Sequence, residues 1–236
     1  MRAATRSLSV VIPAYNEAGN IVGTLTNVTS ALAGLPLAAE IIVVDDGSKD
    51  GTGEIVRANA GRFPSVSLLV NQRNMGFGWT YRRGVDAATR DYIVMIHGDN
   101  AWAAETLRGF LGRTGDADII IGYTRDMWRS RTWTRTAISK TFTLLVNLIT
   151  RRRLKYYNGL QIHRAPVLKN LTVQSTGYGF QAEVLVKALR VTKTFIEVPL
   201  DLMEREKGES KAFRLRNVTD TLRTLKLLCT VEWGLR

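Results

Sequence analysis

The sequence contains a single cysteine, Cys229, among 236 residues. One cysteine excludes an intramolecular disulfide and a multi-cysteine zinc site, and it indicates a reducing compartment. Long hydrophobic runs are also missing: residues 142–149 are broken by Thr143 and Asn147 and fall far short of the ~20 residues that span a bilayer. The N-terminal residues lead into a strand-like segment without the apolar core of a secretory signal. We therefore expect a cytoplasmic protein, either free or peripheral on the cytoplasmic face of a membrane.

Two common nucleotide-binding motifs are also absent. Neither G-x-G-x-x-G directly after a first strand nor G-x-x-x-x-G-K-[ST] occurs. The nearest run, GFGWTY at residues 76–81, has only two of the three glycines of the first motif. Any bound nucleotide would therefore be held by side chains and strand-end carboxylates rather than by a glycine-rich phosphate loop.

Positive charge is abundant but unevenly distributed. The formal net charge is +12; residues 1–120 contain 11 Lys and Arg against 12 Asp and Glu, whereas residues 121–236 contain 22 against 9. This division indicates a catalytic platform followed by a region that faces an anion. Nucleic acid, a phosphorylated substrate and an acidic membrane surface all meet that description.

The first 123 residues alternate between two kinds of segment. Short runs rich in Val and Ile predict strands at residues 8–13, 40–45, 66–71, 91–97 and 117–123. Helical patterns lie between them, at about residues 20–33, 52–60, 78–89 and 104–113. Such alternation predicts an α/β fold with a mostly parallel sheet, whose ligand site lies at the carboxyl ends of the strands.

Polar or turn-forming residues follow each of the five predicted strands. The segments are PAYNE at residues 13–17, DDGS at 45–48, NMGFG at 74–78, HGDN at 97–100 and YTR at 123–125. Any one of them is ordinary turn chemistry. Five in succession would line one edge of the sheet and predict a functional site there.

Seven segments together resemble a known family. They are VVIPAYNE, IIVVDDGSKDGT, NQRNMGFGWTYRRG, YIVMIHGDN, DIIIGYTR, GFQAEVLVKA and EVPLDLMEREKGESK, within residues 8–213. Their order and spacing resemble the family 2 glycosyltransferases, and more narrowly the dolichol-phosphate mannose synthase branch. The resemblance implies a GT-A fold: a Rossmann-like, mostly parallel sheet with helices on both faces and a basic C-terminal helical region. It divides the chain into a glycosyltransferase domain, residues 1–210, and an amphipathic basic helix, residues 211–236. Within the domain, a donor half (about 1–123) would precede an acceptor half (about 124–210).

The resemblance also implies roles for individual residues. Those expected to bind the nucleotide sugar are Pro13, Tyr15, Glu17, Val44, Asp46, His97, Gly98 and Asp99. His97-Gly98-Asp99 matches the D-x-D element that holds a divalent cation, Mg²⁺ or Mn²⁺, on the donor diphosphate. The residues expected to act in catalysis are Asp99, Arg125, Arg205 and Lys211, of which the three cations would engage donor or acceptor phosphates.

Two departures from the family pattern leave questions open. His97 replaces the first D-x-D carboxylate, and imidazole suits late first-row ions better than Mg²⁺. His97 is therefore either a metal ligand or a structural histidine beside Asp99. KYYNGL at residues 155–160 stands where the branch carries an Asp before its Gly-Phe-Arg element, which leaves the sugar and the acceptor undetermined.

The basic half favours a phosphate acceptor at a membrane. A phosphate monoester has a second pKa of about 6, so it is largely dianionic at neutral pH and needs no general base. Two basic amphipathic helices, at about residues 132–150 and 213–231, suit an anionic bilayer surface. An alternative is that both helices pack their apolar faces on the sheet.

The leading hypothesis is therefore an inverting glycosyltransferase. It would move a sugar from a GDP-mannose- or UDP-hexose-type donor to a polyprenyl or dolichyl phosphate at the membrane surface. The main alternative is transfer to a saccharide or small-molecule hydroxyl, with Glu183 as the base. A nucleic-acid-binding module is disfavoured because the basic residues accompany an apolar helix rather than an aromatic stacking platform. Whether a small membrane subunit supplies an anchor stays open.

Overall fold

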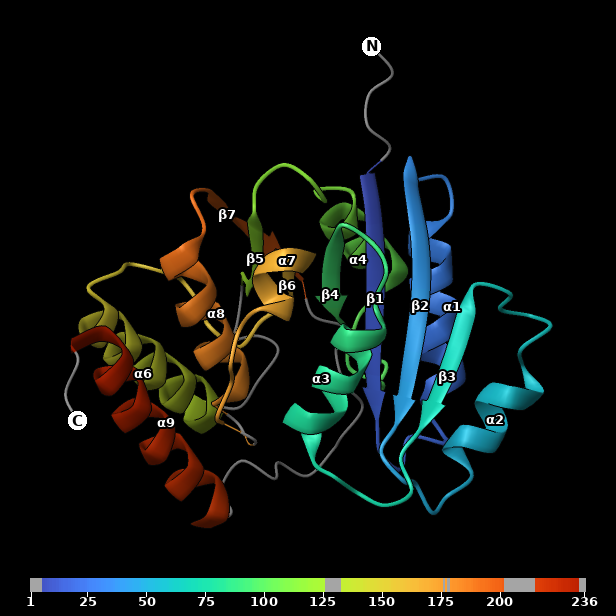
Figure 1. Cartoon of the computed structure of the whole chain (residues 1–236), viewed down its shortest axis with the longest axis horizontal. Helices are drawn as coiled ribbons and strands as arrows, with labels where there is room; N and C mark the ends of the chain where they lie inside the picture. The colour runs from blue at the N-terminus through green and yellow to red at the C-terminus, as the bar shows by residue number, and fades with distance from the viewer. Residues whose placement is uncertain (1–5, 126–132, 176, 178, 202–214, 234–236) are drawn as a thin grey trace.

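The computed structural model describes residues 6–125, 133–175, 177, 179–201 and 215–233 (Figure 1). Its strands are β1 (Arg6–Ala14), β2 (Leu37–Asp45), β3 (Val66–Val70), β4 (Tyr92–Met95), β5 (Ile119–Thr124), β6 (Gln161–Arg164) and β7 (Phe195–Leu200). Its helices are α1 (Ile21–Leu32), α2 (Thr52–Ala58), α3 (Phe77–Ala87), α4 (Ala104–Leu111), α6 (Trp133–Thr150), α7 (Ala165–Lys169), α8 (Phe180–Val191) and α9 (Leu215–Trp233). The predicted α/β class, with five strands and four helices in the first 124 residues, is confirmed.

The described strands form one sheet in the order β3-β2-β1-β4-β6-β5-β7. All neighbouring pairs are parallel except the two that involve β6, which runs antiparallel to both β4 and β5. The mostly parallel sheet is therefore confirmed. The sequence pattern did not predict β6, a four-residue strand inserted between β4 and β5.

Helices cover both faces of the sheet, as expected. Alternate residues of β1 point to opposite faces, so that Val10 and Ile12 belong to one buried cluster and Val11 to another. The first cluster includes α1, α2 and α4, and the second includes α3, α7 and α8. Gly84 allows α3 to approach the sheet closely, because a Cβ there would overlap the side chain of Val11.

A third buried cluster joins β5 to the C-terminal part of the chain. It contains Ile119 and Ile121 of β5, Val146 of α6, Leu185 of α8 and Leu228 of α9. Helix α9 packs along α6 and also contacts α8 (Figure 1). Both predicted amphipathic helices therefore exist, and each buries one face on the rest of the domain. Within the described residues, no helix combines the length and the hydropathy needed to cross a bilayer.

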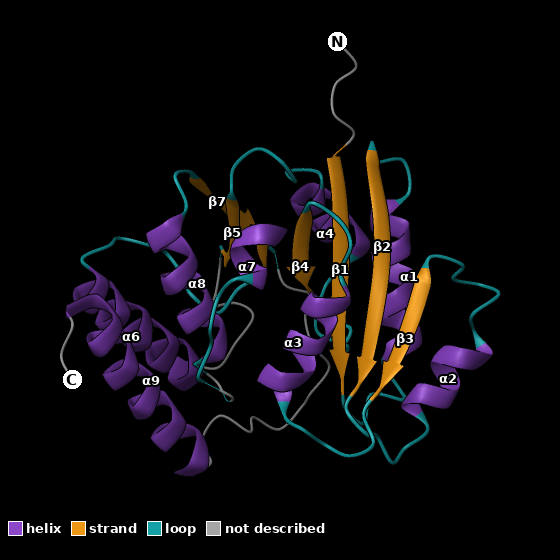
Figure 2. Ribbon diagram, viewed as in Figure 1, coloured by secondary structure: helices purple, strands orange, loops and turns teal. Residues whose placement is uncertain are grey.

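The direction of the strands fixes where a site can form. Strands β1, β2 and β3 end at the same edge of the sheet (Figure 2), and β4 runs parallel to β1. Because β6 is antiparallel to both β4 and β5, β5 also ends at this edge and β6 begins there. The five polar strand ends therefore share one edge. The division into donor and acceptor halves stays a prediction, and the single sheet includes strands from both.

Candidate active site

The loops after β1 and β2 are tied together by hydrogen bonds. The amide of Asn16, a residue with φ 55°, donates to Ser48 Oγ over 2.9 Å, and Asn16 Oδ1 accepts from the Lys49 amide. The Glu17 amide donates to Thr52 Oγ1 over 2.9 Å. Asn tolerates this left-handed backbone better than most residues. These bonds hold the loop after β1, which carries the predicted nucleoside-binding residues Tyr15 and Glu17, against the loop after β2.

The residues predicted to hold the nucleoside differ in exposure. Tyr15 is 43% exposed and offers its ring to a ligand, whereas Glu17 is half-buried and accepts a hydrogen bond from Asn20 Nδ2 at 2.7 Å. Pro13 pairs with Val44 across β1 and β2. The Val44 side chain is fully buried in the cluster beneath α3, so that only the Val44 backbone is available at the strand end.

Asp46 is buried, and both of its carboxylate oxygens accept hydrogen bonds from other residues of the protein. Its Oδ1 accepts from Asn71 Nδ2 and the Met75 amide, each at 2.8 Å, and its Oδ2 accepts from the Gly76 amide at 2.9 Å. The carboxylate therefore shapes the loop that leads from β3 into α3. Asp46 and Asp99 follow β2 and β4, which are both neighbours of β1 and not of each other.

The His97-Gly98-Asp99 element is packed against the end of β1. The Gly98 amide donates to the Pro13 carbonyl over 3.3 Å, and a Cβ at Gly98 would lie 3.2 Å from the Ala14 Cβ and 3.5 Å from Glu17 Cγ. Thr24 Oγ1 of α1 donates to the Gly98 carbonyl at 2.9 Å. Of the predicted residues, the structure thus brings together Pro13, Glu17 and Gly98.

The donor set at this strand end suits a divalent cation shared with a ligand. Within the described residues, no group of three or more His, Cys, Asp or Glu side chains is placed to hold a metal. His97 and Asp99 offer one imidazole and one carboxylate, so a bound cation would need further oxygens, which a diphosphate supplies. A mixed nitrogen and oxygen set suits Mn²⁺ better than Mg²⁺.

A basic residue stands at the end of β5. Arg125 is exposed, and its amide donates to the Leu200 carbonyl over 3.1 Å. Beside it, Lys155 Nζ donates to the Tyr123 hydroxyl at 3.0 Å and lies 4.3 Å from the centre of the Tyr123 ring. The hydrogen bond with Tyr123 raises the pKa of Lys155. Arg125 and Lys155 thus place two cationic side chains near the end of β5.

The segment before β6 is pressed against β5. A Cβ at Gly159 would overlap the carbonyl oxygen of Gly122, and Gly122 donates its amide to the Leu160 carbonyl at 2.7 Å. Next to it, the buried Oδ1 of Asn158 accepts no hydrogen bond from the described residues. Asn158 belongs to the segment at residues 155–160, which stands where the resemblance leads us to expect an Asp.

Glu183 lies in α8 and is fully buried. Its Oε1 accepts from Lys187 Nζ at 2.5 Å and from the Gln174 amide at 2.9 Å, and its Oε2 accepts from the Ser175 amide at 2.7 Å. Burial raises the pKa of Glu183, but these hydrogen bonds outweigh it and leave the pKa below its ordinary value. The ionised Glu183 carboxylate therefore stabilises the loop before α8 through its bonds to the Gln174 and Ser175 amides.

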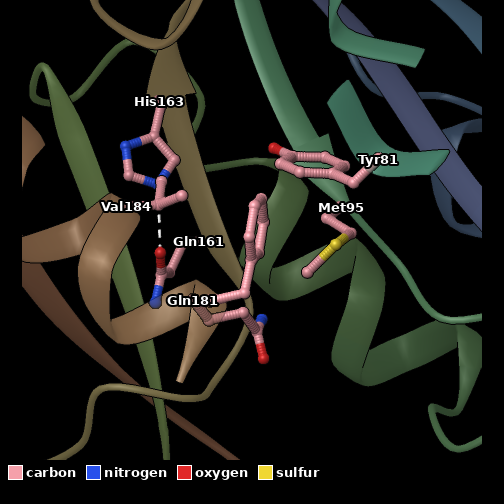
Figure 3. Close-up of a pocket in the computed structure, with 7 residues that line it drawn as sticks. Tyr81, Met95, Gln161, His163, Gln181 and Val184 are labelled. Carbon is pink, nitrogen blue, oxygen red and sulfur yellow. Dashed lines mark hydrogen bonds between the residues drawn. The ribbon is translucent and has the colours of Figure 1, made fainter. Parts of the chain in front are cut away.

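A small internal cavity lies behind the N-terminus of α8 (Figure 3). Among its lining residues are Tyr81, Phe180, Gln161 and His163. His163 Nε2 lies 3.1 Å from Gln161 Oε1, while its buried Nδ1 has no hydrogen-bond partner among the described residues. Burial lowers the pKa of His163 to about 4, which keeps the imidazole neutral. Most of the residues that line this cavity are buried, so we assign the cavity to the packing of the core below the polar strand ends.

Arg205 and Lys211 lie outside the described residues, so their roles stay predictions. The sequence pattern missed Phe77, which stacks on His97, and Asn71, which supports Asp46. Phe77 directly follows Gly76 and Asn71 directly follows β3, and these positions were the sequence signals that could have pointed to them.

The mostly parallel sheet with helices on both faces and a polar strand-end edge is the architecture expected of a GT-A glycosyltransferase. The model described as Glycosyl transferase family 2 matches residues 9–169, and the chain belongs to this family. It is a glycosyltransferase, and the resemblance seen in its motifs is confirmed.

Curated relatives of similar length support the narrower resemblance. An undecaprenyl-phosphate mannosyltransferase from Micrococcus luteus is 31% identical, with 85% of each chain covered. A polyprenol monophosphomannose synthase from Mycolicibacterium smegmatis is 30% identical over 98% of this chain and 88% of the relative.

Solved structures show the same fold. Mannosyl-3-phosphoglycerate synthase from Rubrobacter xylanophilus has a TM-score of 0.76 at 17% identity. The match covers 98% of this chain and 76% of the synthase chain. Glucosyl-3-phosphoglycerate synthase from Mycobacterium tuberculosis, in complex with Mn²⁺, uridine diphosphate and phosphoglyceric acid, has a TM-score of 0.72 at 19% identity, with 98% and 80% covered.

Proposed function

We propose that this glycosyltransferase moves a sugar from a nucleoside-diphosphate sugar to a polyprenyl phosphate, with inversion at the anomeric carbon. One observation carries the proposal. The carboxylate of Glu183, the candidate general base, already accepts hydrogen bonds from Lys187 and two backbone amides. A hydroxyl acceptor needs a base within reach, whereas a phosphate dianion does not. The names of the two curated relatives support the same acceptor class.

The reaction is a single displacement. A phosphate oxygen of the acceptor forms a bond to the anomeric carbon, and the bond from that carbon to the donor diphosphate breaks, with its electron pair leaving on the nucleoside diphosphate. His97 and Asp99 would hold a divalent cation, which neutralises the leaving diphosphate when bound. Arg125 would guide the acceptor phosphate from the end of β5, since a guanidinium pairs with phosphate oxygens without removing a proton.

The acceptor test compares three variants on undecaprenyl phosphate, with radiolabelled GDP-mannose and UDP-glucose as the two donor probes. Glu183→Gln and its matched control Lys187→Met break the same ion pair, so we expect similar, modest losses of turnover per folded molecule. Arg205→Ala, whose role rests on the family resemblance, should lose about 1.5–3 kcal/mol of charged hydrogen bonding, or roughly tenfold to a hundredfold in rate. Collapse of turnover in Glu183→Gln alone, with Arg205→Ala near normal, would establish a hydroxyl acceptor with a general base.

We also propose that α6 and α9 bring the site to an anionic bilayer. On α6, Trp133 is 72% exposed, Leu144 58% and Leu148 63%, and helical spacing places them on one side with Lys140. On α9, Leu222 is 61% exposed beside the exposed Arg223. Apolar anchors among cations are typical of helices that lie at the surface of an acidic membrane.

Vesicle binding tests the membrane proposal. The purified chain should sediment with vesicles that contain phosphatidylglycerol and much less with pure phosphatidylcholine. Replacing Leu144 and Leu148 together with Ser should abolish binding, while the matched control Val191→Ser, an exposed apolar residue at the end of α8, should leave it unchanged. Failure of the wild-type chain to bind either vesicle would point instead to an anchor on a separate subunit.

A further inference from the structure

Phe77 connects the two sides of the site. Its ring is stacked on the His97 imidazole, with centroids 5.1 Å apart and planes 9° apart. The same ring meets Phe180 edge-on, at 5.8 Å and 90°. One side chain therefore contacts both His97, which follows β4, and the first residue of α8.

The position of Phe77 is set by rigid neighbours. Asp46 holds the amides of Met75 and Gly76, and Gly76 has φ 92°, a conformation that favours glycine. Helix α3 starts directly afterwards. On the other side, a Cβ at Gly78 would lie only 3.0 Å from Phe180 Cδ2 and 3.1 Å from the Ser175 carbonyl. The start of α3 is thus held by Asp46 on one side and packs closely against α8 on the other, which restricts the Phe77 ring.

This stack has a consequence for metal binding. An imidazole binds a metal through a nitrogen lone pair in the plane of its ring, so the orientation of the ring sets the direction of the bond. The stack occupies one face of the His97 ring and fixes its plane, while the nitrogens lie on the ring edge. A carboxylate at position 97 would gain no such orientation from Phe77.

We propose that Phe77 is a positioning residue that fixes the His97 imidazole for a divalent cation beside Asp99, and so favours Mn²⁺, which accepts a nitrogen ligand more readily than Mg²⁺ does. The inference rests on the proposed function only in placing the donor cation at His97 and Asp99. Asp46, expected from the family to contact the nucleoside, contributes by holding the loop that presents Phe77.

The first test observes the histidine ring itself. The chain contains only two histidines, His97 and His163, so a protein labelled at histidine gives two sets of ring signals, assigned with His163→Gln. We expect an upfield ring-current shift at His97 that disappears in Phe77→Leu and persists in the conservative variant Phe77→Tyr. Trp79→Leu is the matched control, because it removes a 46%-exposed aromatic of the same helix.

The second test measures Mn²⁺ binding by electron paramagnetic resonance, with UDP and GDP each as the diphosphate probe. Phe77→Leu should weaken Mn²⁺ binding at least about tenfold, as loss of a supporting group around a metal ligand does. Phe77→Tyr should restore it. In a His97→Asp background, Phe77→Leu should change Mn²⁺ affinity by less than about threefold, because the ring that Phe77 orients is gone.

Three results would overturn the inference. These are an unchanged His97 signal in Phe77→Leu, an equal loss of Mn²⁺ affinity from Phe77→Leu in the wild type and in the His97→Asp background, and a failure of Phe77→Tyr to restore affinity. None of them depends on the acceptor. A wild-type chain that binds Mn²⁺ as expected and yet never glycosylates a polyprenyl phosphate would refute the proposed function alone.

Discussion

The Oδ2 of Asp46 accepts a hydrogen bond from the backbone amide of Gly76 at a distance of 2.9 Å. With the bonds from Asn71 and Met75 to Oδ1, this makes a strand-end carboxylate the organiser of the next loop along the sheet. A residue predicted to touch the nucleoside thus has a structural task that does not depend on any ligand.

Asp46→Ala should therefore destabilise the protein as well as weaken nucleotide binding. It leaves the buried Asn71 amide group and two part-buried backbone amides without acceptors, at a cost on the order of 3 kcal/mol in the free energy of unfolding. Urea denaturation measures this loss. The control is Asp86→Ala, which removes an exposed ion pair with Arg82 and should cost less than about 1 kcal/mol. Equal stability of the two variants would show that Asp46 does not organise the loop.

Acid should destabilise the protein through His163. Its folded pKa of about 4 lies below the unfolded value of about 6.5, so the unfolded chain binds the extra proton first. The stability from neutral His163 is complete above about pH 6.5 and is lost as the pH falls towards 4, by roughly 3 kcal/mol in total. Urea denaturation at several pH values should show this slope in the wild type and a shallower one in His163→Gln. An identical slope in both would contradict the prediction.

Gly159→Ala should destabilise the packing of the segment before β6 against β5. The new methyl would overlap the Gly122 carbonyl, and the backbone of β5 cannot give way as a flexible side chain can. We expect a fall in the melting temperature of more than about 5 °C. Gly61→Ala, at a site with nothing within 4 Å of the added Cβ, should leave the melting temperature nearly unchanged. Similar melting curves for both variants would argue against the close approach.

Activity should depend on a cation held at residues 97 and 99. Asp99→Ala should abolish metal-stimulated turnover, and His97→Asp should shift the preference from Mn²⁺ towards Mg²⁺, because carboxylate oxygen suits the harder ion. Turnover measured across a titration of each metal, after removal of bound ions with chelator, checks both. An unaltered metal profile in His97→Asp would assign His97 a structural role.

The sequence alone determined the secondary structure of the N-terminal half of this protein. Strands buried on both faces read as short runs of Val and Ile, and glycine, asparagine and aspartate mark the turns that follow them. These are local signals, so five strands, four helices and the common edge of their polar ends were predictable. The ordered motifs also identified the family, since their spacing reflects the whole fold.

Other features were decided only by the tertiary structure. Strand β6 is four residues long and carries no periodic signal; it is defined by its backbone pairing with β4 on one side and β5 on the other. The stack of Phe77 on His97 joins residues far apart in the chain, and no local pattern encodes that contact. Likewise, Glu183 looks like a base in the sequence, and only the fold shows that Lys187 and two amides already hold its carboxylate. Local patterns fix which elements form, whereas the distances between side chains depend on how those elements pack.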